Sequence, residues 1–203
     1  MYNTVVVDGD NLVLMHDRDI DVNIRSLELG AHIDSINLVT GERKRVAKNI
    51  RVSGSGGRLF QAGGRIAWRQ FKSGGFKSKV VEYDVRTGRK RTLIDNLDRD
   101  ATEAYILDGD ADRLLVSRRY GEFLLGFSTS FDLYEGAEEV SSVVRFPSSY
   151  VKPYAYLPGA ASARLVDQYV VWMDPYDGSL AVRHMDTGET RRVVLEAQSS
   201  LSD

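Results

Sequence analysis

Four short runs of hydrophobic residues recur along the chain and predict buried strands. They lie at residues 12–15, 66–68, 114–116 and 170–173, and each follows turn-forming residues rich in glycine or aspartate. Three of the runs are continuous rather than alternating, a pattern typical of strands that are covered on both faces. The chain therefore contains four similar buried strands, each entered from a turn.

A second recurring pattern follows each hydrophobic run and predicts a β-hairpin. Residues 38–42, 85–89, 133–137 and 185–189 read LVTGE, VRTGR, LYEGA and MDTGE, with glycines at 41, 88, 136 and 188. Glycine supplies the positive φ that such a hairpin demands. The strands expected next, at 42–46, 89–94, 138–144 and 189–194, are charged, as exposed edge strands usually are. A period of about 50 residues made of short strands is typical of a β-propeller blade.

These patterns predict an all-β protein, a single β-propeller array of four blades with four antiparallel strands each. The blades are expected at about residues 1–50, 51–97, 98–146 and 160–197, with a connection at 147–159. Residues 18–31 interrupt the first blade and are predicted to form a long loop.

The blade pattern resembles the TolB-like (also called WD40-like) propeller repeat family over nearly the whole chain. Trp68 and Trp172 stand where that family often has an aromatic residue on the second strand, and residues 83–88 are the best match, with Asp84 at the usual aspartate position. Asn37 and His184 depart from that aspartate in the first and fourth blades, and the third hairpin has Glu135 in place of threonine. The resemblance implies a fold but no single activity, since the family includes interaction modules, peptidase lids and polysaccharide lyases.

Four blades leave the closure of the ring open. Members of the family mostly have six to eight blades, and an open four-blade array would expose hydrophobic flanks on its first and last blades. Three arrangements can cover these flanks: a closed four-bladed ring, an eight-bladed ring made of two copies, and a larger propeller completed by other polypeptide.

Composition adds little to this picture. The 203 residues are 42% hydrophobic and 28% charged, which is ordinary for a soluble domain. The chain has no cysteine, which fits a reducing compartment. Neither a signal-peptide pattern nor a membrane-spanning hydrophobic run is present in the sequence as written, so a cytoplasmic location is the default expectation and no membrane partner is expected.

Charge is distributed unevenly along the chain. Residues 43–91 hold 15 lysines and arginines but only two acidic residues, whereas the net charge of the whole chain is −2. One interpretation is a site for a polyanion such as nucleic acid or an acidic polysaccharide; the others are self-association against acidic blades and an acidic protein partner. The candidate binding residues in the second blade are Arg65, Arg69, Lys72, Lys77 and Lys79.

No residue pattern predicts a catalytic centre, a metal site or a cofactor. His16, His32 and His184 are far apart in the sequence and lack the spacing of metal ligands. Residues 108–112 begin like a calcium loop but are not followed by its glycine and glutamate. The sequence also lacks a nucleophile elbow and a cysteine nucleophile.

The connection at 147–159 carries further binding candidates, Tyr150, Tyr154 and Tyr156, between prolines. Tyrosines on a proline-stiffened loop suit a binding surface, although the segment can equally be a connection that packs over the third blade. We interpret the chain as a non-catalytic binding or scaffold module for protein–protein interaction or assembly. The alternative is an enzyme or enzyme-accessory domain that acts on or binds an acidic polysaccharide or another polyanion.

Overall fold

The computed structural model describes residues 4–17, 28–53, 59–71, 78–95, 101–122, 126–136, 138–146, 163–174 and 178–193. These residues form four four-stranded antiparallel sheets, each with its strands in chain order. The first sheet has β1 (Thr4–Asp8), β2 (Asn11–Asp17), β3 (Glu28–Asn37) and β4 (Arg43–Ser53), and the second has β5 (Leu59–Ala62), β6 (Arg65–Phe71), β7 (Ser78–Asp84) and β8 (Lys90–Asp95). The third has β9 (Ala101–Gly109), β10 (Arg113–Glu122), β11 (Gly126–Glu135) and β12 (Glu138–Phe146), and the fourth has β13 (Arg164–Val166), β14 (Tyr169–Met173), β15 (Leu180–His184) and β16 (Thr190–Val193).

The all-β prediction is confirmed, and the four hydrophobic runs lie in the second strands β2, β6, β10 and β14. The described residues contain no helix long and apolar enough to cross a membrane.

Three of the four hairpins between third and fourth strands share one turn structure. Asn37 Oδ1 accepts hydrogen bonds from the amides of the residues two and three positions later, both at 2.9 Å. Asp84 Oδ1 does the same at 2.8 and 3.0 Å, and His184 Nδ1 at 3.2 and 3.4 Å. Three different side chains thus present an acceptor at the same place in the turn.

Two local predictions differ from the structure. The third hairpin is tighter than the others, because β11 and β12 remain paired as far as Glu135 and Glu138. The loop predicted at 18–31 is wrong in its last four residues: β3 begins at Glu28, and Gly30 and Ala31 pair with Arg51 and Ile50 of the unusually long β4. Residues 18–27 lie outside the described part of the chain.

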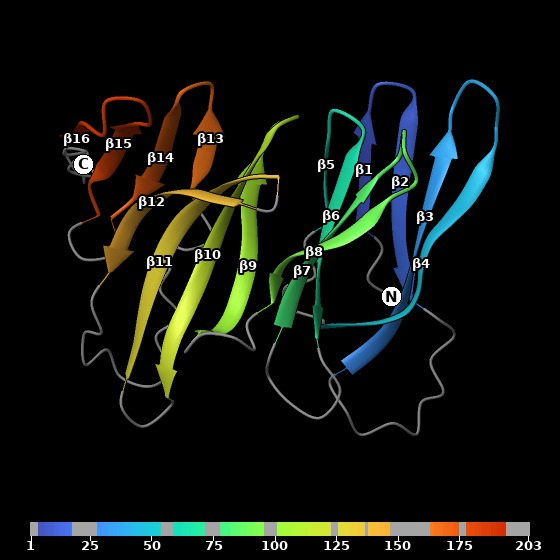
Figure 1. Ribbon diagram of the computed structural model, residues 1–203, viewed down its shortest axis with the longest axis horizontal. Helices are drawn as coiled ribbons and strands as arrows, with labels where there is room; N and C mark the ends of the chain where they lie inside the picture. Colours follow the sequence, from blue (N-terminus) through green and yellow to red (C-terminus); the bar gives the residue numbers. More distant parts are fainter. Residues whose placement is uncertain are drawn as a thin grey trace, which may run out of the picture.

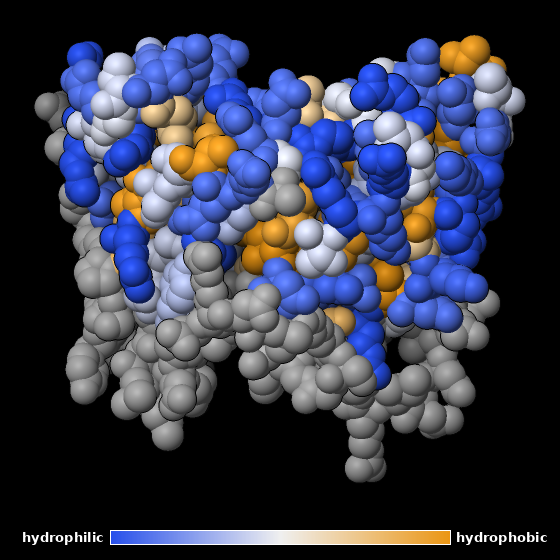
Figure 2. All heavy atoms as spheres, in the orientation of Figure 1, coloured by the Kyte–Doolittle hydropathy of each residue, from blue (hydrophilic) through white to orange (hydrophobic). Residues whose placement is uncertain are grey.

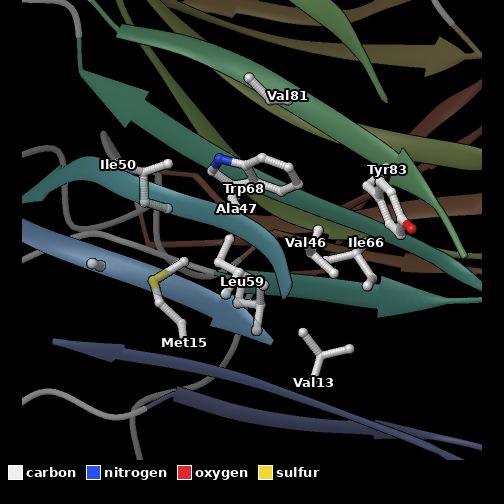
Figure 3. Packing of buried hydrophobic residues seen from close by; sticks show 12 residues of the cluster. Val13, Met15, Val46, Ala47, Ile50, Leu59, Ile66, Trp68, Val81 and Tyr83 are labelled. Atoms are coloured by element: carbon white, nitrogen blue, oxygen red, sulfur yellow. The ribbon is translucent and has the colours of Figure 1, made fainter. Parts of the chain in front are cut away.

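Three hydrophobic cores lie between consecutive sheets. Val13, Met15 and Ile33 of the first sheet meet Ile66, Trp68 and Tyr83 of the second. Figure 3 shows Val13 and Met15 on the side of the first sheet and Ile66, Trp68 and Tyr83 on the second. Ala67 and Val80 of the second sheet meet Leu114, Val116 and Tyr134 of the third. Leu115, Phe131 and Leu133 of the third sheet meet Val170 and Trp172 of the fourth. Figure 2 shows mainly hydrophilic side chains on the visible face, with hydrophobic ones near its middle.

The array is open rather than a closed four-bladed ring. In Figure 1 the first and fourth sheets lie at opposite ends of the long axis, with the second and third sheets between them. The extensive contacts between sheets within the described residues link only consecutive sheets. Four sheets in a closed ring would share four cores, whereas the described residues form three. One face of each terminal sheet therefore has no neighbouring sheet among the described residues.

Candidate functional site

Arg65 holds the second and third sheets together. Its Nε donates a hydrogen bond to Glu82 Oε2 at 2.9 Å, and its Nη1 donates to the carbonyl oxygen of Ala111, in the turn before β10, at 2.9 Å. Glu82 is buried and also forms an ion pair with Arg91, Nη2 to Oε1, at 2.7 Å. The predicted binding residue Arg65 thus contributes to packing between blades.

Arg69 is likewise part of the interior. It is only 3% exposed, and its guanidinium Cζ lies 4.3 Å from the ring centre of Phe71 and 3.9 Å from that of Tyr105 on β9. Such cation–π stacking is strengthened by removal from water. Arg69 therefore links the second and third sheets as well.

Lys79 is half-buried on β7 and has a basic neighbour, Lys90 on β8. Burial and the positive charge of Lys79 lower the pKa of Lys90. Lys90 Nζ lies 5.1 Å from the ring centre of Trp68, and Lys44 Nζ of β4 lies 5.5 Å from that of Tyr83. These three lysines lie at the junction of the first and second sheets. The other predicted binding residues, Lys72, Lys77, Tyr150, Tyr154 and Tyr156, lie outside the described residues.

Buried carboxylates that the sequence did not single out are all paired with basic side chains. Asp34 is 1% exposed and interacts with Arg43, Arg45 and His16, the His16 Nε2 to Asp34 Oδ2 distance being 2.8 Å. Burial raises the pKa of Asp34, but the hydrogen bonds from these three partners outweigh burial and lower the pKa to about 2. The sequence alone does not reveal this pairing. The pairing becomes evident once the strand register is known, because Asp34 of β3 stands opposite Arg45 of β4.

Asp132 in the third sheet is held in the same way. Arg118 Nε and Ser130 Oγ each donate a hydrogen bond to Asp132 Oδ2 at 2.6 Å, and Arg118 Nη2 also reaches Glu139 at 2.6 Å. The described residues contain no group of three or more histidine, aspartate or glutamate side chains placed to hold a metal ion. The buried carboxylates therefore act as structural ion-pair partners in the described part of the chain.

The uncovered face of the first sheet carries a hydrophobic cluster beside Asp34 and its basic partners; we call this face the first-sheet flank. Cross-strand partners share a face of a sheet, and Val5 pairs with Leu14, Val7 with Leu12, and Leu12 with Ile36. Val5 and Val7 are 53% and 57% exposed. The intervening residues, such as Val13, point the other way into the core with the second sheet.

The uncovered face of the fourth sheet carries a hydrophobic cluster as well, beside Arg164, His184 and Arg191; we call this face the fourth-sheet flank. Its side chains alternate with Val170, Trp172 and Ala181, which face the third sheet. Its hydrophobic members are Val166, Tyr169, Val171, Met173, Leu180, Val182 and Val193. Of the large hydrophobic side chains that are exposed in the described residues, all but Val140 belong to the first sheet, its hairpin or the fourth sheet. The two flanks are thus the candidate functional site.

Comparison with known proteins supports the fold and no more. No protein-family model and no curated protein matches the chain. The β-propeller domain of the Trilobed protease from Pyrococcus furiosus is similar with a TM-score of 0.64 and 11% identity, over 97% of this chain and 58% of that one. Acylaminoacyl peptidase from Pyrococcus horikoshii is similar with a TM-score of 0.62 and 13% identity, over 95% of this chain and 32% of that one.

The chain spans less than two thirds of each of these similar proteins. At such low identity the similarity concerns the fold alone. The chain is a four-sheet array with a β-propeller fold, similar to propellers found in peptidases.

Proposed function

We propose that this chain is a non-catalytic β-propeller module of the TolB-like type that works in protein–protein interaction or assembly through its first-sheet and fourth-sheet flanks. The observation that carries this proposal is a contrast between polar side chains inside the array and hydrophobic side chains at its two ends. The half-buried Arg65 and the buried Glu82 and Asp132 are engaged in ion pairs and hydrogen bonds within the array. Hydrophobic side chains on the strands at both ends have no neighbouring sheet in the part of the chain that the structure describes.

The flanks are suited to binding because they lie on paired strands. Their side chains are positioned by a register of backbone hydrogen bonds, so little ordering is needed when a partner arrives. Full burial of an exposed valine or leucine side chain is worth about 1.5–3 kcal/mol. Several such residues on each flank therefore supply enough hydrophobic surface to drive association.

The experiment that tests this function places a charge on each flank. Leu14→Glu and Val171→Glu are compared with Val140→Glu, a control at an exposed position of β12. We expect both flank variants to keep the far-ultraviolet circular dichroism spectrum of the natural chain. They should also lose any association seen in sedimentation velocity or, where the natural chain is monomeric and its flanks are uncovered, binding of a hydrophobic dye. The control should behave like the natural chain, and flank variants that associate and bind dye like the natural chain would contradict the proposal.

A second candidate function is polyanion binding at the junction of the first and second sheets. Lys79 and Lys90 are close enough for their charges to interact, and the positive charge of Lys79 disfavours the charged form of Lys90. An anion bound between two such like charges would relieve their repulsion.

A heparin column tests this candidate function. Lys79→Ala and Lys90→Ala should elute at lower salt than the natural chain, because a screened electrostatic contact weakens with each lost charge. Arg191→Ala, which removes an exposed arginine paired with Glu189, serves as the control. Equal elution of all three variants would exclude this lysine site.

A further inference from the structure

We propose that the partner on both flanks is a second copy of this chain, so that two copies form one eight-bladed ring. The fourth-sheet flank of each copy packs on the first-sheet flank of the other. This inference rests on the proposed function and names its partner. It follows from the way the sheets alternate along the array.

The first sheet resembles the third. Asp8 is the last residue of β1 and Asp108 the last but one of β9. Each accepts a hydrogen bond from a backbone amide of the following sheet: Asp8 from Gly64 at 3.0 Å and Asp108 from Leu165 at 2.9 Å. Each sheet also has a buried aspartate on its third strand, Asp34 or Asp132, ion-paired with a basic side chain of its second strand, His16 or Arg118. The two odd-numbered sheets therefore share the same internal structure.

The second sheet resembles the fourth. Trp68 and Trp172 occupy the same place on the second strand, and each is buried in the core shared with the preceding sheet. On the opposite face, Ala67 pairs with Glu82 as Val171 pairs with Val182. Each even-numbered sheet thus packs one face on the odd-numbered sheet before it. The residues on the other face of the second sheet have counterparts at the same positions of the fourth sheet.

The junction between the second and third sheets is therefore a template for the junction between two copies. In the template, Ala67 and Val80 meet Leu114, Val116 and Tyr134. The corresponding fourth-sheet residues, by strand register, are Val171 and Leu180. The corresponding first-sheet residues are Leu12, Leu14 and Ile36. Hydrophobic side chains thus meet hydrophobic side chains at each of these positions, whereas Phe60, which packs on the template core, corresponds to Arg164.

The differences from the template also favour contact between copies. Arg69 and Glu82 of the second sheet correspond to Met173 and Val182 of the fourth, so the fourth-sheet flank has fewer charges to desolvate. On the first-sheet flank, Asp34 is already paired with Arg43, Arg45 and His16. Burying that flank therefore leaves no unpaired carboxylate, which would otherwise be costly.

Two copies related by a twofold axis cover all four flanks at once. Each copy contributes one first-sheet flank and one fourth-sheet flank, and the same contact occurs twice. A head-to-tail contact closes into a ring only if the rotation between neighbouring copies, when repeated, completes a full turn. Eight blades lie within the range of propellers that close.

Solution mass is the first test. Light scattering on a sizing column is expected to give a discrete species of about twice the 22.7 kDa chain mass. The species should resist high salt, because its contacts are hydrophobic. A chain that remains monomeric at tens of micromolar, or one that forms a ladder of longer polymers, overturns the ring.

Cross-linking tests which flanks meet. The chain has no cysteine, so single cysteines can be introduced without background. A short bis-maleimide should join Leu14→Cys and Val171→Cys chains when the two variants are mixed after unfolding and refolding. Neither variant alone should form a cross-linked dimer, because the ring places unlike flanks in contact. Cross-linking of one variant to itself would overturn the arrangement.

Two further variants calibrate the cross-linking. The double variant Ala67→Cys and Val116→Cys probes the template junction, whose side chains are buried, so the reagent is added before refolding. The two cysteines should then be joined within one chain, since both residues belong to one core. Val140→Cys mixed with Leu14→Cys should not react. If the chain proves monomeric while Leu14→Glu and Val171→Glu still reduce dye binding, the second copy is excluded as partner and the flanks remain binding surfaces.

Discussion

At the scale of single residues, Asp132 has a larger role than its place on a repeated strand suggests. It is 1% exposed, and its carboxylate is the partner of the buried Arg118. Asp132→Asn removes that charge and leaves the guanidinium in a poorly hydrated site. We expect the free energy of unfolding in urea to fall by about 3 kcal/mol. Glu189→Gln, in the exposed pair with Arg191, should have no measurable effect, and equal losses in the two variants would contradict this account.

Asp34 should make stability depend on acidic pH. Its pKa is about 2 in the folded chain, below the ordinary value of 3.8, so the stabilisation is fully present above about pH 4. It should be lost as the pH falls through the folded pKa, because protonation then weakens the pairs with Arg43 and Arg45. The expected loss from this group is about 2 kcal/mol.

Urea unfolding at several pH values between about 2 and 5 measures this dependence. Asp34→Asn should be less stable than the natural chain near neutral pH and should have a flatter pH dependence. The same slope in both chains would show that other carboxylates cause it.

At the scale of strands and turns, Gly63 has a role that its counterpart Gly9 lacks. Both have a positive φ, at 57° and 54°, in the turn between a first and a second strand. A Cβ at Gly63 would clash with Ala111 of the third sheet and lie 2.8 Å from its Cα, whereas a Cβ at Gly9 would meet no atom within 4 Å. Gly9→Ala should cost about 1 kcal/mol from backbone strain. Gly63→Ala should cost about 2 kcal/mol more, because its turn must move away from the third sheet.

Thermal unfolding of the two glycine variants measures the difference. Equal shifts in melting temperature would mean that the close approach between the second and third sheets adds nothing to stability.

The sequence was informative for elements whose local chemistry repeats. The hydrophobic runs predicted the second strands because covered strands need hydrophobic side chains on both faces. The hairpins were predicted from glycine, although the acceptor role of His184 was not, since any side chain with a well-placed acceptor can serve there. The extension of β3 and β4 to Glu28 and Ser53 was missed because pairing between distant residues leaves no local signal.

At the scale of the whole molecule, the sequence left the closure of the array undecided. Leu12 and Leu14 lie on an uncovered face, yet they match Leu114 and Val116, which are buried between sheets. A hydrophobic position thus predicts that this face of the sheet is covered, but it does not predict which sheet covers it. The basic character of the second blade was evident from composition. The use of Arg65 and Arg69 in contacts between sheets could be recognised only from the three-dimensional arrangement.

An open array should respond unequally to the loss of its two tryptophans. Trp172 lies in the core that attaches the fourth sheet, and among the described residues that sheet has a neighbouring sheet on one side alone. In a nearest-neighbour array, Trp172→Ala should therefore release the fourth sheet while the other three remain folded. Trp68→Ala weakens the attachment of the first sheet, whose core with the second sheet holds twelve buried residues. A buried tryptophan truncated to alanine costs about 3–5 kcal/mol in either case.

Native-state hydrogen exchange, at a concentration low enough for the chain to be monomeric, distinguishes the two variants. Trp172→Ala should accelerate exchange in β14 and β15 and leave protection in β6 and β7 unchanged, because those strands belong to other cores. Trp68→Ala should accelerate exchange in β2 and β3 and leave β14 and β15 protected. Loss of protection in all four sheets in both variants would mean that the array unfolds as one cooperative unit. In that case the stability of each sheet would depend on more than its nearest neighbours.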